Sequence, residues 1–325
     1  MCQKMKVLLI DPMHEKLRGS GRHVQYLIEA LSNKVKFELW NIRKIGYINF
    51  PKLRSISFYI NCKKREIPKD IDIIHIHNPK FAGLFKGSCK NILTIHGDYE
   101  MELKMKYGRI IKPILWYINK QMMKANVITT VSPYWAEIKK WRWIPNMINL
   151  KKVESILPSD ECYILFVGRD DPIKNYPTFR KIAKQAYEEI GIKSLALGIM
   201  KEDVEYLKHD KVPWECVISY MKSAYAMIIT SKQEGFPSTI LEAWASGCPV
   251  VAYKIPPLIA LAEKYPNSFL LFNDMKEALK ILKNLRNKEV REKLIQNAKE
   301  YVKQFDSRIV AEEYYKLYKS LIKSF

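Results

Sequence analysis

The sequence predicts an α/β protein built from two successive parallel sheets with helices on their faces. Short runs rich in β-branched residues alternate with longer amphipathic stretches, and this alternation stops near the middle of the chain and then starts again. Strands that alternate with helices favour βαβ units and therefore parallel sheets. The length of 325 residues also suits two domains, because single hydrophobic cores rarely grow beyond roughly 250 to 300 residues.

Each half of the chain is expected to supply five strands. The expected strands of the first half are residues 6–10, 36–40, 71–77, 91–96 and 126–132, and those of the second are 162–168, 194–198, 226–230, 248–252 and 268–272. The break between the halves is placed near residues 157–160, where Pro158 and polar residues interrupt both patterns. From about Asp274 the chain is predicted to be helical, with a last helix over residues 307–325.

The positive charge of the chain lies mainly in its first half. Of 55 Lys+Arg and 34 Asp+Glu, residues 1–155 hold 29 and 12, and the remainder holds 26 and 22. A basic half indicates an anionic partner such as a membrane surface, a nucleic acid or a phosphorylated acceptor. The alternative is a solvated charged surface with no partner.

The sequence predicts a cytoplasmic protein that is soluble or peripheral on the inner face of the membrane. The apolar stretch before Asp11 is too short for a signal peptide, and no window approaches the ~18 apolar residues of a membrane span. Six cysteines lie far apart without metal-binding spacing, which favours reduced thiols.

Chemistry is expected in the loops that follow the strands, because ligands of open parallel sheets bind at the carboxyl ends of strands. After the strand 226–230, the turn at Gly235 opens a helix near Ser238 or Thr239, and backbone N–H groups at a helix start bind anions or sugar hydroxyls. Glu234, just before this turn, can accept two neighbouring hydroxyls of a sugar. Glu242 lies eight positions after Glu234. Its spacing from Thr239 fits a capping box, in which its side chain would fold back on the helix start instead of binding a ligand.

The run EGFPSTILEAWASGCPVVAY, residues 234–253, resembles the E-x7-E signature of the retaining glycosyltransferase family 4, which has the GT-B fold. The resemblance covers nearly the whole chain. It continues, in order, through RGSGRHVQYLIEAL (18–31), TIHGDYE (94–100), ITTVSPYWAE (128–137), IPN (144–146) and VGRDDPIKNYPTF (167–179).

The resemblance implies two Rossmann-like domains that face each other across a cleft. Residues 1–156 would form the acceptor-side domain and residues 157–305 the nucleotide-sugar domain, and the helix 306–325 would pack back on the first domain. It also implies site residues. His96 and Glu234 are the expected catalytic residues, and those expected to bind the donor are Gly19, Arg169, Lys174, Gly235, Phe236, Pro237 and Glu242.

In these roles, Arg169 and Lys174 would stabilise the leaving nucleotide, Glu234 and the backbone of the following turn would hold the sugar hydroxyls, and Glu242 would bind the ribose. His96 would contact the transferred sugar. One departure affects the first loop, where the family commonly has two adjacent glycines and this chain has Arg18 before Gly19.

The expected activity is retaining transfer of a hexose from a UDP- or GDP-linked sugar to an unknown acceptor, lipid-linked or glycan. No metal and no cofactor is expected, because the segment Asp70-Ile71-Asp72 is better explained as a strand start than as a metal motif. The absence of G-x-G-x-x-G after the first strand argues against a dinucleotide oxidoreductase. The alternatives are a nucleotide-sugar epimerase of the same fold, or a basic protein that binds or glycosylates nucleic acid.

Three further features have two interpretations each. His75 and His77 share one face of a strand but lack a third metal ligand, so a structural role is expected. Trp214 either stacks on a base or packs in the core, with packing favoured. The basic, aromatic segment 104–124 suits a helix on an anionic membrane, or a helix that packs on its own sheet with a lysine-rich outer face.

Overall fold

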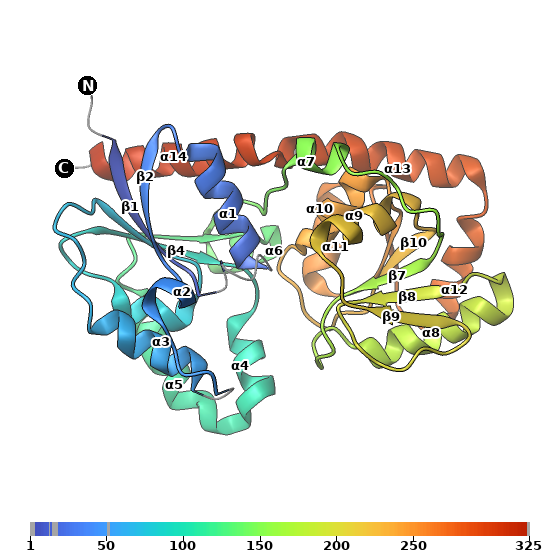
Figure 1. Cartoon of the computed structure of the whole chain (residues 1–325), viewed down its shortest axis with the longest axis horizontal. Coiled ribbons are helices and arrows are strands. Elements are labelled where there is room, and N and C mark those ends of the chain that lie inside the picture. The colour runs from blue at the N-terminus through green and yellow to red at the C-terminus, as the bar shows by residue number, and fades with distance from the viewer. Residues whose placement is uncertain (1–3, 13, 15–18, 51–52, 324–325) are drawn as a thin grey trace. The chain divides into compact units, whose positions relative to one another are not determined.

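The structure, a computed structural model, describes residues 4–12, 14, 19–50 and 53–323, and its contacts divide the chain into two units (Figure 1). Unit 1 consists of Met1–Met147 and Ser307–Phe325, and unit 2 of Ile148–Asp306. The predicted domain boundary after residue 156 falls inside unit 2, past its first helix, α7 (Leu150–Glu154).

Unit 1 contains a six-stranded parallel sheet in the order β2-β1-β3-β4-β5-β6. The strands are β1 (Met5–Ile10), β2 (Val35–Trp40), β3 (Ile73–Ile76), β4 (Lys90–Ile95), β5 (Val127–Thr130) and β6 (Arg142–Trp143). The helices are α1 (Ser20–Leu31), α2 (Ile42–Ile45), α3 (Arg54–Lys63), η2 (Pro79–Leu84), α4 (Tyr99–Tyr107), η3 (Gly108–Ile111), α5 (Lys112–Met122), α6 (Pro133–Lys139) and α14 (Ser307–Lys323).

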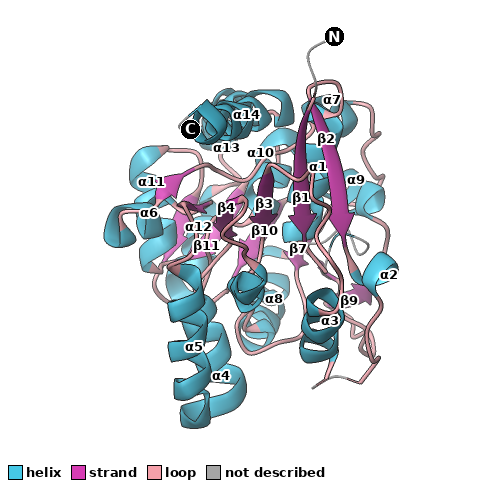
Figure 2. Ribbon diagram, turned by 90° about the vertical axis from the view of Figure 1, so that its left-hand side faces the viewer, coloured by secondary structure: helices cyan, strands magenta, loops and turns pink. Residues whose placement is uncertain are grey.

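Helices cover both faces of this sheet, and Figure 2 shows the strands between them. One face carries α1 and the terminal helix α14, whose Val310, Tyr314 and Leu317 pack with β1 in one buried cluster. The predicted return of the last helix to the first sheet is therefore confirmed. The other face carries α3, η2 and α5. Burial on both faces explains why β1, β3 and β4 are nearly continuous apolar runs.

Unit 2 contains a second six-stranded parallel sheet, in the order β12-β11-β10-β7-β8-β9. The strands are β7 (Ile164–Val167), β8 (Ser194–Leu197), β9 (Leu207–Asp210), β10 (Ala226–Ile229), β11 (Val250–Tyr253) and β12 (Leu270–Phe272). Besides α7, the helices are α8 (Tyr176–Ile190), α9 (Trp214–Ser223), α10 (Ser238–Ser246), α11 (Pro256–Lys264), α12 (Met275–Asn284), α13 (Lys288–Val302) and η4 (Lys303–Phe305).

All ten expected strands are present, and two strands were missed. These are β6 and β9, and each lies at one edge of its sheet. β6 has only two residues, and β9 reads Leu-Lys-His-Asp, so neither contains an apolar run. Edge strands commonly carry charged residues that discourage pairing with other chains, which removes the pattern by which strands are found.

Candidate active site

The predicted donor residues of unit 2 are grouped around the point where its strand order reverses. β7 pairs with β10 on one side and with β8 on the other. From β7 the chain runs outward through β8 to β9, and it then continues on the other side of β7 through β10 and β11 to β12. In open α/β sheets, ligands bind outside the carboxyl ends of the strands at such a point. The loops that follow β7 and β10 are therefore the candidate donor loops.

The loop after β7 presents two basic side chains. Arg169 is bound to Asp171 (Nε–Oδ2 3.0 Å), but two thirds of its side chain remain exposed. Asp171 also accepts a hydrogen bond from the backbone N–H of Lys174 (2.9 Å), which shapes the turn. Gly198, at the end of β8, has φ +97°, and a Cβ there would lie 2.6 Å from the carbonyl oxygen of Gly168. Only glycine allows this close approach beside the loop.

The loop after β10 joins the first loop through an ion pair. Lys174 Nζ lies 2.5 Å from Glu234 Oε1, and only a tenth of the Glu234 side chain is exposed. Thr230 Oγ1 donates to the carbonyl of Lys174 (2.9 Å), and the N–H of Lys232 donates to that of Ile173 (2.8 Å). The structure thus brings together two residues that are 60 positions apart in the sequence.

The turn after Glu234 offers backbone groups and no side chains. The Phe236 ring is fully buried and packs edge-to-face on Phe305 at 5.2 Å, and Gly235 and Pro237 are buried as well. Helix α10 begins at Ser238, directly after Pro237. Because Pro237 has no N–H, the donors that this turn can present are the N–H groups of its other residues.

Glu242 does not form the capping box that its spacing suggested. No side chain caps the start of α10, and Thr239 is already inside the helix. Glu242 lies in the second turn, is buried, and its Oε1 accepts a hydrogen bond from Trp214 Nε1 at 3.0 Å. Trp214 is half-buried at the start of α9, with Lys152 Nζ over its ring at 4.9 Å. The capping interpretation is therefore wrong, and Glu242 is linked to α9 instead.

In unit 1, His96 follows β4 and belongs to a cluster of imidazoles. His96 Nε2 lies 3.2 Å from His77 Nδ1, so one of the two nitrogens donates to the other. The His23 ring meets His96 edge-on at 5.1 Å, and His23 Nδ1 is 3.1 Å from Asn146 Oδ1. His75 is bound through Nδ1 to Tyr318 Oη and through Nε2 to Thr94 Oγ1, both at 2.7 Å.

This environment keeps the imidazoles neutral. Burial lowers the pKa of His96 to about 4, partly offset by a hydrogen bond with Asn146. Burial and the neighbouring His96 lower the pKa of His75 to about 3. The pKa values of His23 and His77 are also well below the usual value, again mainly because of burial. At neutral pH, His96 therefore acts as a polar hydrogen-bonding group without charge.

The remaining predicted positions add little geometry. Gly19 has φ +53° and precedes α1, and a Cβ added there would meet nothing within 4 Å, whereas Arg18 lies outside the described residues.

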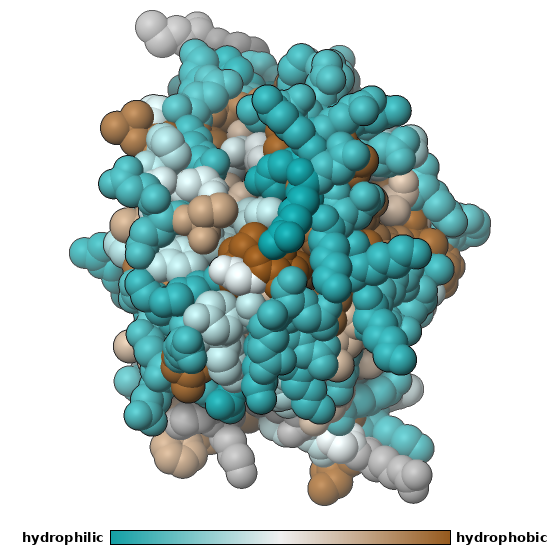
Figure 3. All heavy atoms as spheres, turned by 90° about the vertical axis from the view of Figure 1, so that its right-hand side faces the viewer, coloured by the Kyte–Doolittle hydropathy of each residue, from teal (hydrophilic) through white to brown (hydrophobic). Residues whose placement is uncertain are grey.

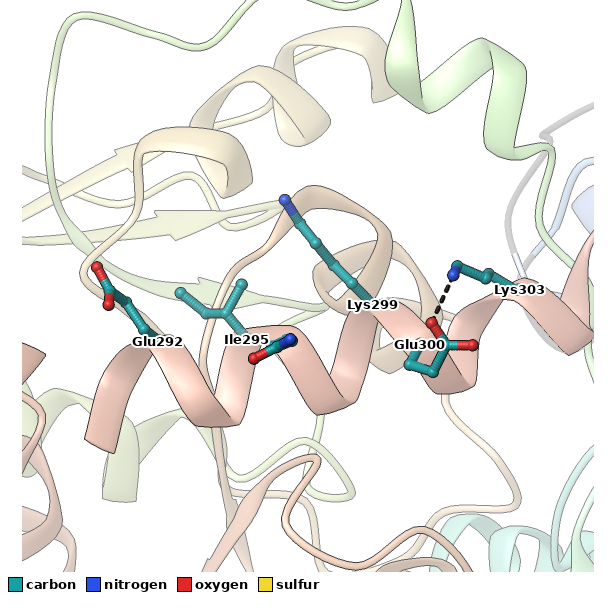
Figure 4. Close-up of a pocket in the computed structure, with 6 residues that line it drawn as sticks. Glu292, Ile295, Lys299, Glu300 and Lys303 are labelled. Atoms are coloured by element: carbon teal, nitrogen blue, oxygen red, sulfur yellow. Dashed lines mark hydrogen bonds and ion pairs between the residues drawn. The ribbon is translucent and has the colours of Figure 1, made fainter. Parts of the chain in front are cut away.

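Within the described ranges, no three His, Cys, Asp or Glu side chains are grouped as a metal site would need. The groove in Figure 4 lies on helix α13 and η4, lined by Glu292, Lys299 and their neighbours, and includes none of the predicted donor residues.

Three contributors to these loops were not expected from the sequence. His77 contacts His96, although it was assigned a purely structural role. Asn146 contacts His23, and its place in the IPN segment was the available signal. Tyr176 Oη lies 2.6 Å from His209 Nε2, which ties the start of α8 to β9 just after Lys174. No sequence pattern pairs residues 176 and 209, because β9 itself was missed.

Comparison with known families matches both units. A model described as "Glycosyltransferase Family 4" matches residues 15–151, and one described as "Glycosyl transferases group 1" matches residues 148–301. An uncharacterized glycosyltransferase of Methanocaldococcus jannaschii is 26% identical over 93% of this chain and 94% of its own length.

Solved structures agree on the fold. Sucrose-phosphate synthase from Thermosynechococcus elongatus superimposes with a TM-score of 0.77 at 18% identity, over 99% of this chain and all of that one. HepE of Anabaena, solved in complex with UDP and glucose, gives 0.73 at 13% identity, over 97% of this chain and all of that one. With two adjacent family models covering the candidate loops of both units, the chain belongs to glycosyltransferase family 4 and is a glycosyltransferase of the GT-B fold.

Proposed function

We propose that the protein transfers a hexose from a UDP- or GDP-linked sugar, with retention at the anomeric carbon and without a metal ion, to a lipid-linked or glycan acceptor. The observation that carries this proposal is the convergence of Arg169, Lys174 and Glu234 at the strand-order reversal of unit 2. HepE and an alpha-glucosyltransferase of similar fold were solved with UDP or UDP-glucose, which supports a nucleotide-sugar donor.

Both basic residues are paired with carboxylates in the structure. Arg169 is paired with Asp171 and Lys174 with Glu234. A pyrophosphate is a doubly charged acceptor, and each charge-assisted hydrogen bond to it contributes about 1.5 to 3 kcal/mol. We therefore expect the donor to draw Arg169 and Lys174 toward its phosphates, which leaves the Glu234 oxygens to accept sugar hydroxyls.

The same two cations would assist departure of the nucleotide. When the bond between the sugar and the phosphate breaks, negative charge develops on the leaving phosphate oxygen. Positively charged groups that are already in place stabilise that charge and lower the barrier. Two such groups take the place of a metal ion in neutralising the leaving group. His96 is neutral at physiological pH, so it would donate a hydrogen bond to a sugar hydroxyl or accept one from it. It would not pair with the phosphates as a cation does.

A donor screen tests this proposal. The protein is incubated with UDP- and GDP-linked hexoses, and released nucleoside diphosphate is measured with and without a chelator. We expect release from one donor class, undiminished by chelator. With no acceptor added, water takes the sugar, and the hexose released from an α-linked donor should appear first as the α-anomer by NMR. Loss of release with chelator would contradict the metal-free mechanism, and conversion of the donor sugar without release of nucleotide would favour epimerisation.

A further inference from the structure

Exposed large apolar side chains are concentrated in one part of unit 1. Of the 17 such residues among those described, 13 lie between residues 48 and 123, whereas unit 2 contributes only Leu157 and Met200. The face drawn in Figure 3, which looks onto unit 2, is mostly hydrophilic. Single exposed apolar residues are ordinary, but a contiguous group marks an interaction surface.

Two helices of unit 1 carry most of this group. On α3 and its start, Leu53, Ile56 and Ile60 follow each other at helical spacing, and on η3 and α5, Ile110 and Ile114 do the same. Figure 1 shows α3, α4 and α5 gathered at the end of unit 1 opposite α14. The basic apolar face is defined by its exposed members, Ile48, Phe50, Leu53, Ile56, Ile60, Ile110, Ile114, Trp116, Tyr117 and Met123.

These helices have their own buried sides, so their packing on the sheet does not depend on the exposed aliphatic residues. Phe58 and Cys62 of α3, and Leu115, Ile118 and Met122 of α5, are buried in one cluster. The two helices are also joined directly, because Tyr59 Oη of α3 lies 3.1 Å from Tyr117 Oη of α5. The exposed apolar residues of α5 therefore lie outside its buried side, in two rows, Ile114 with Tyr117 and Trp116 with Met123.

The two segments that carry this face contain only basic charges, and the acidic residues Glu66 and Glu102 flank them. Residues 43–65 and 103–124 together contain 13 Lys+Arg and no Asp or Glu. Lys63 lies over the Tyr59 ring at 5.5 Å, and Lys120 over the Trp116 ring at 5.1 Å, so cations and aromatic rings are interleaved. The described acidic partners, Glu38 with Lys44 and Glu100 with Lys104, lie outside the two segments.

We propose that the basic apolar face docks unit 1 on an anionic lipid bilayer. Aliphatic residues such as Ile110, 86% exposed, and Met123, 84% exposed, enter the acyl boundary, while Trp and Tyr rings settle at the level of the headgroups. The surrounding lysines and arginines bind anionic headgroups. A nucleic acid would match the charge but not the isoleucines, which neither stack on bases nor bind phosphate. Among the described residues, none of the helices combines the length and the apolar composition that a membrane span requires.

The position of this face along the chain connects it with the acceptor. Helix α4 is capped by Asp98, two residues after His96, and leads through η3 into α5. If the proposed transfer reaction holds, this arrangement fits an acceptor held in the bilayer, since the docked helices continue directly from the His96 loop. The docking itself does not depend on the reaction.

Vesicle flotation of the full chain tests the docking. The wild-type protein should float with vesicles of phosphatidylcholine and phosphatidylglycerol and remain below with phosphatidylcholine alone. The double variant Ile110→Asp/Ile114→Asp should lose at least about tenfold in binding, because both charges would have to enter the apolar boundary. Ile309→Asp on α14 is the matched control, since Ile309 and Ile114 are both 52% exposed, and it should bind like the wild type.

A second pair of variants tests the charge. Lys63→Gln/Lys64→Gln should lower binding to anionic vesicles about tenfold, and Lys316→Gln/Lys319→Gln on α14 should change it little. Absence of vesicle binding by the wild type, equal binding by all variants, or binding of a DNA or RNA duplex in preference to vesicles would overturn the proposal. Circular dichroism and the thermal shift caused by UDP or GDP should stay unchanged in every variant, which separates this outcome from failure of the donor proposal.

Discussion

The two units share a six-stranded parallel sheet but differ in the chemistry at its carboxyl edge. Unit 2 presents ion pairs there, Arg169 with Asp171 and Lys174 with Glu234. Unit 1 presents uncharged imidazoles, with His96 beside His77. The net charge of the whole units shows the opposite contrast, because unit 1 carries 31 Lys+Arg against 13 Asp+Glu and unit 2 carries 24 against 21. We therefore infer that the same fold serves a charged ligand in unit 2 and a charged surface in unit 1.

The largest expected effect concerns the cation at the centre of unit 2. Lys174→Ala should lower kcat/KM about 10²- to 10³-fold, because it removes the charge that we assign to the leaving phosphate and takes away the ion-pair partner of Glu234. Steady-state assay of nucleotide release measures this. Lys283→Ala is the control, since Lys283 forms an ion pair of 2.7 Å with Glu189 on exposed surface, and its activity should match the wild type. Equal loss in both variants would contradict the assignment.

Glu234→Gln should separate sugar binding from nucleotide binding. The change removes the negative partner of Lys174, so binding of the free nucleoside diphosphate should be unchanged or stronger. Transfer should nevertheless fall about 10²-fold, because the amide accepts sugar hydroxyls less strongly than the carboxylate does. Calorimetric titration with the nucleotide, beside the transfer assay, checks both. A parallel fall in nucleotide affinity would place Glu234 outside the sugar subsite.

The neutral cluster of unit 1 should respond to acid. Because the folded pKa of His75 is about 3 and its ordinary value is 6.5, the stability that it contributes is present above pH 6.5 and is lost as the pH falls toward 3. At pH 5 this histidine alone costs about 2 kcal/mol of unfolding free energy. Denaturant unfolding at pH 7 and pH 5, for the wild type and His75→Gln, measures the difference, which should shrink in the variant. An unchanged difference would mean that His75 does not carry it.

The smallest effect concerns the link between α9 and α10. Trp214→Phe removes the indole N–H that binds Glu242 and keeps an aromatic ring. We expect KM for the donor to rise a few-fold with little change in kcat, since a single hydrogen bond contributes about 0.5 to 1.5 kcal/mol and positions Glu242 toward the ribose. Trp141→Phe in unit 1 should leave KM unchanged. A fall in kcat with constant KM would argue against a ribose role for Glu242.

Much of the fold was predictable because buried strands are apolar on both faces. The apolar runs of β7 and β10 are recognisable in the sequence, and the donor loops are the segments that directly follow these two strands. Edge strand β9 has no such run, so the contact between Tyr176 and His209 could not be foreseen. Spacing alone suggested a capping box between Thr239 and Glu242, but the helix begins at Ser238, and the Glu242 carboxylate binds Trp214 instead. Side-chain partners between distant segments leave little trace in local pattern.

The difference between the units is tested most directly by nucleotide binding. Thermal unfolding is followed with UDP, GDP, their monophosphates and the free nucleosides, for the wild type and Lys174→Ala. Our account predicts that one diphosphate raises Tm in the wild type, that the monophosphate does so less and the nucleoside not at all, and that Lys174→Ala abolishes the advantage of the diphosphate. Equal stabilisation of the wild type and the variant by the diphosphate would contradict the assignment of the pyrophosphate to the Lys174 loop.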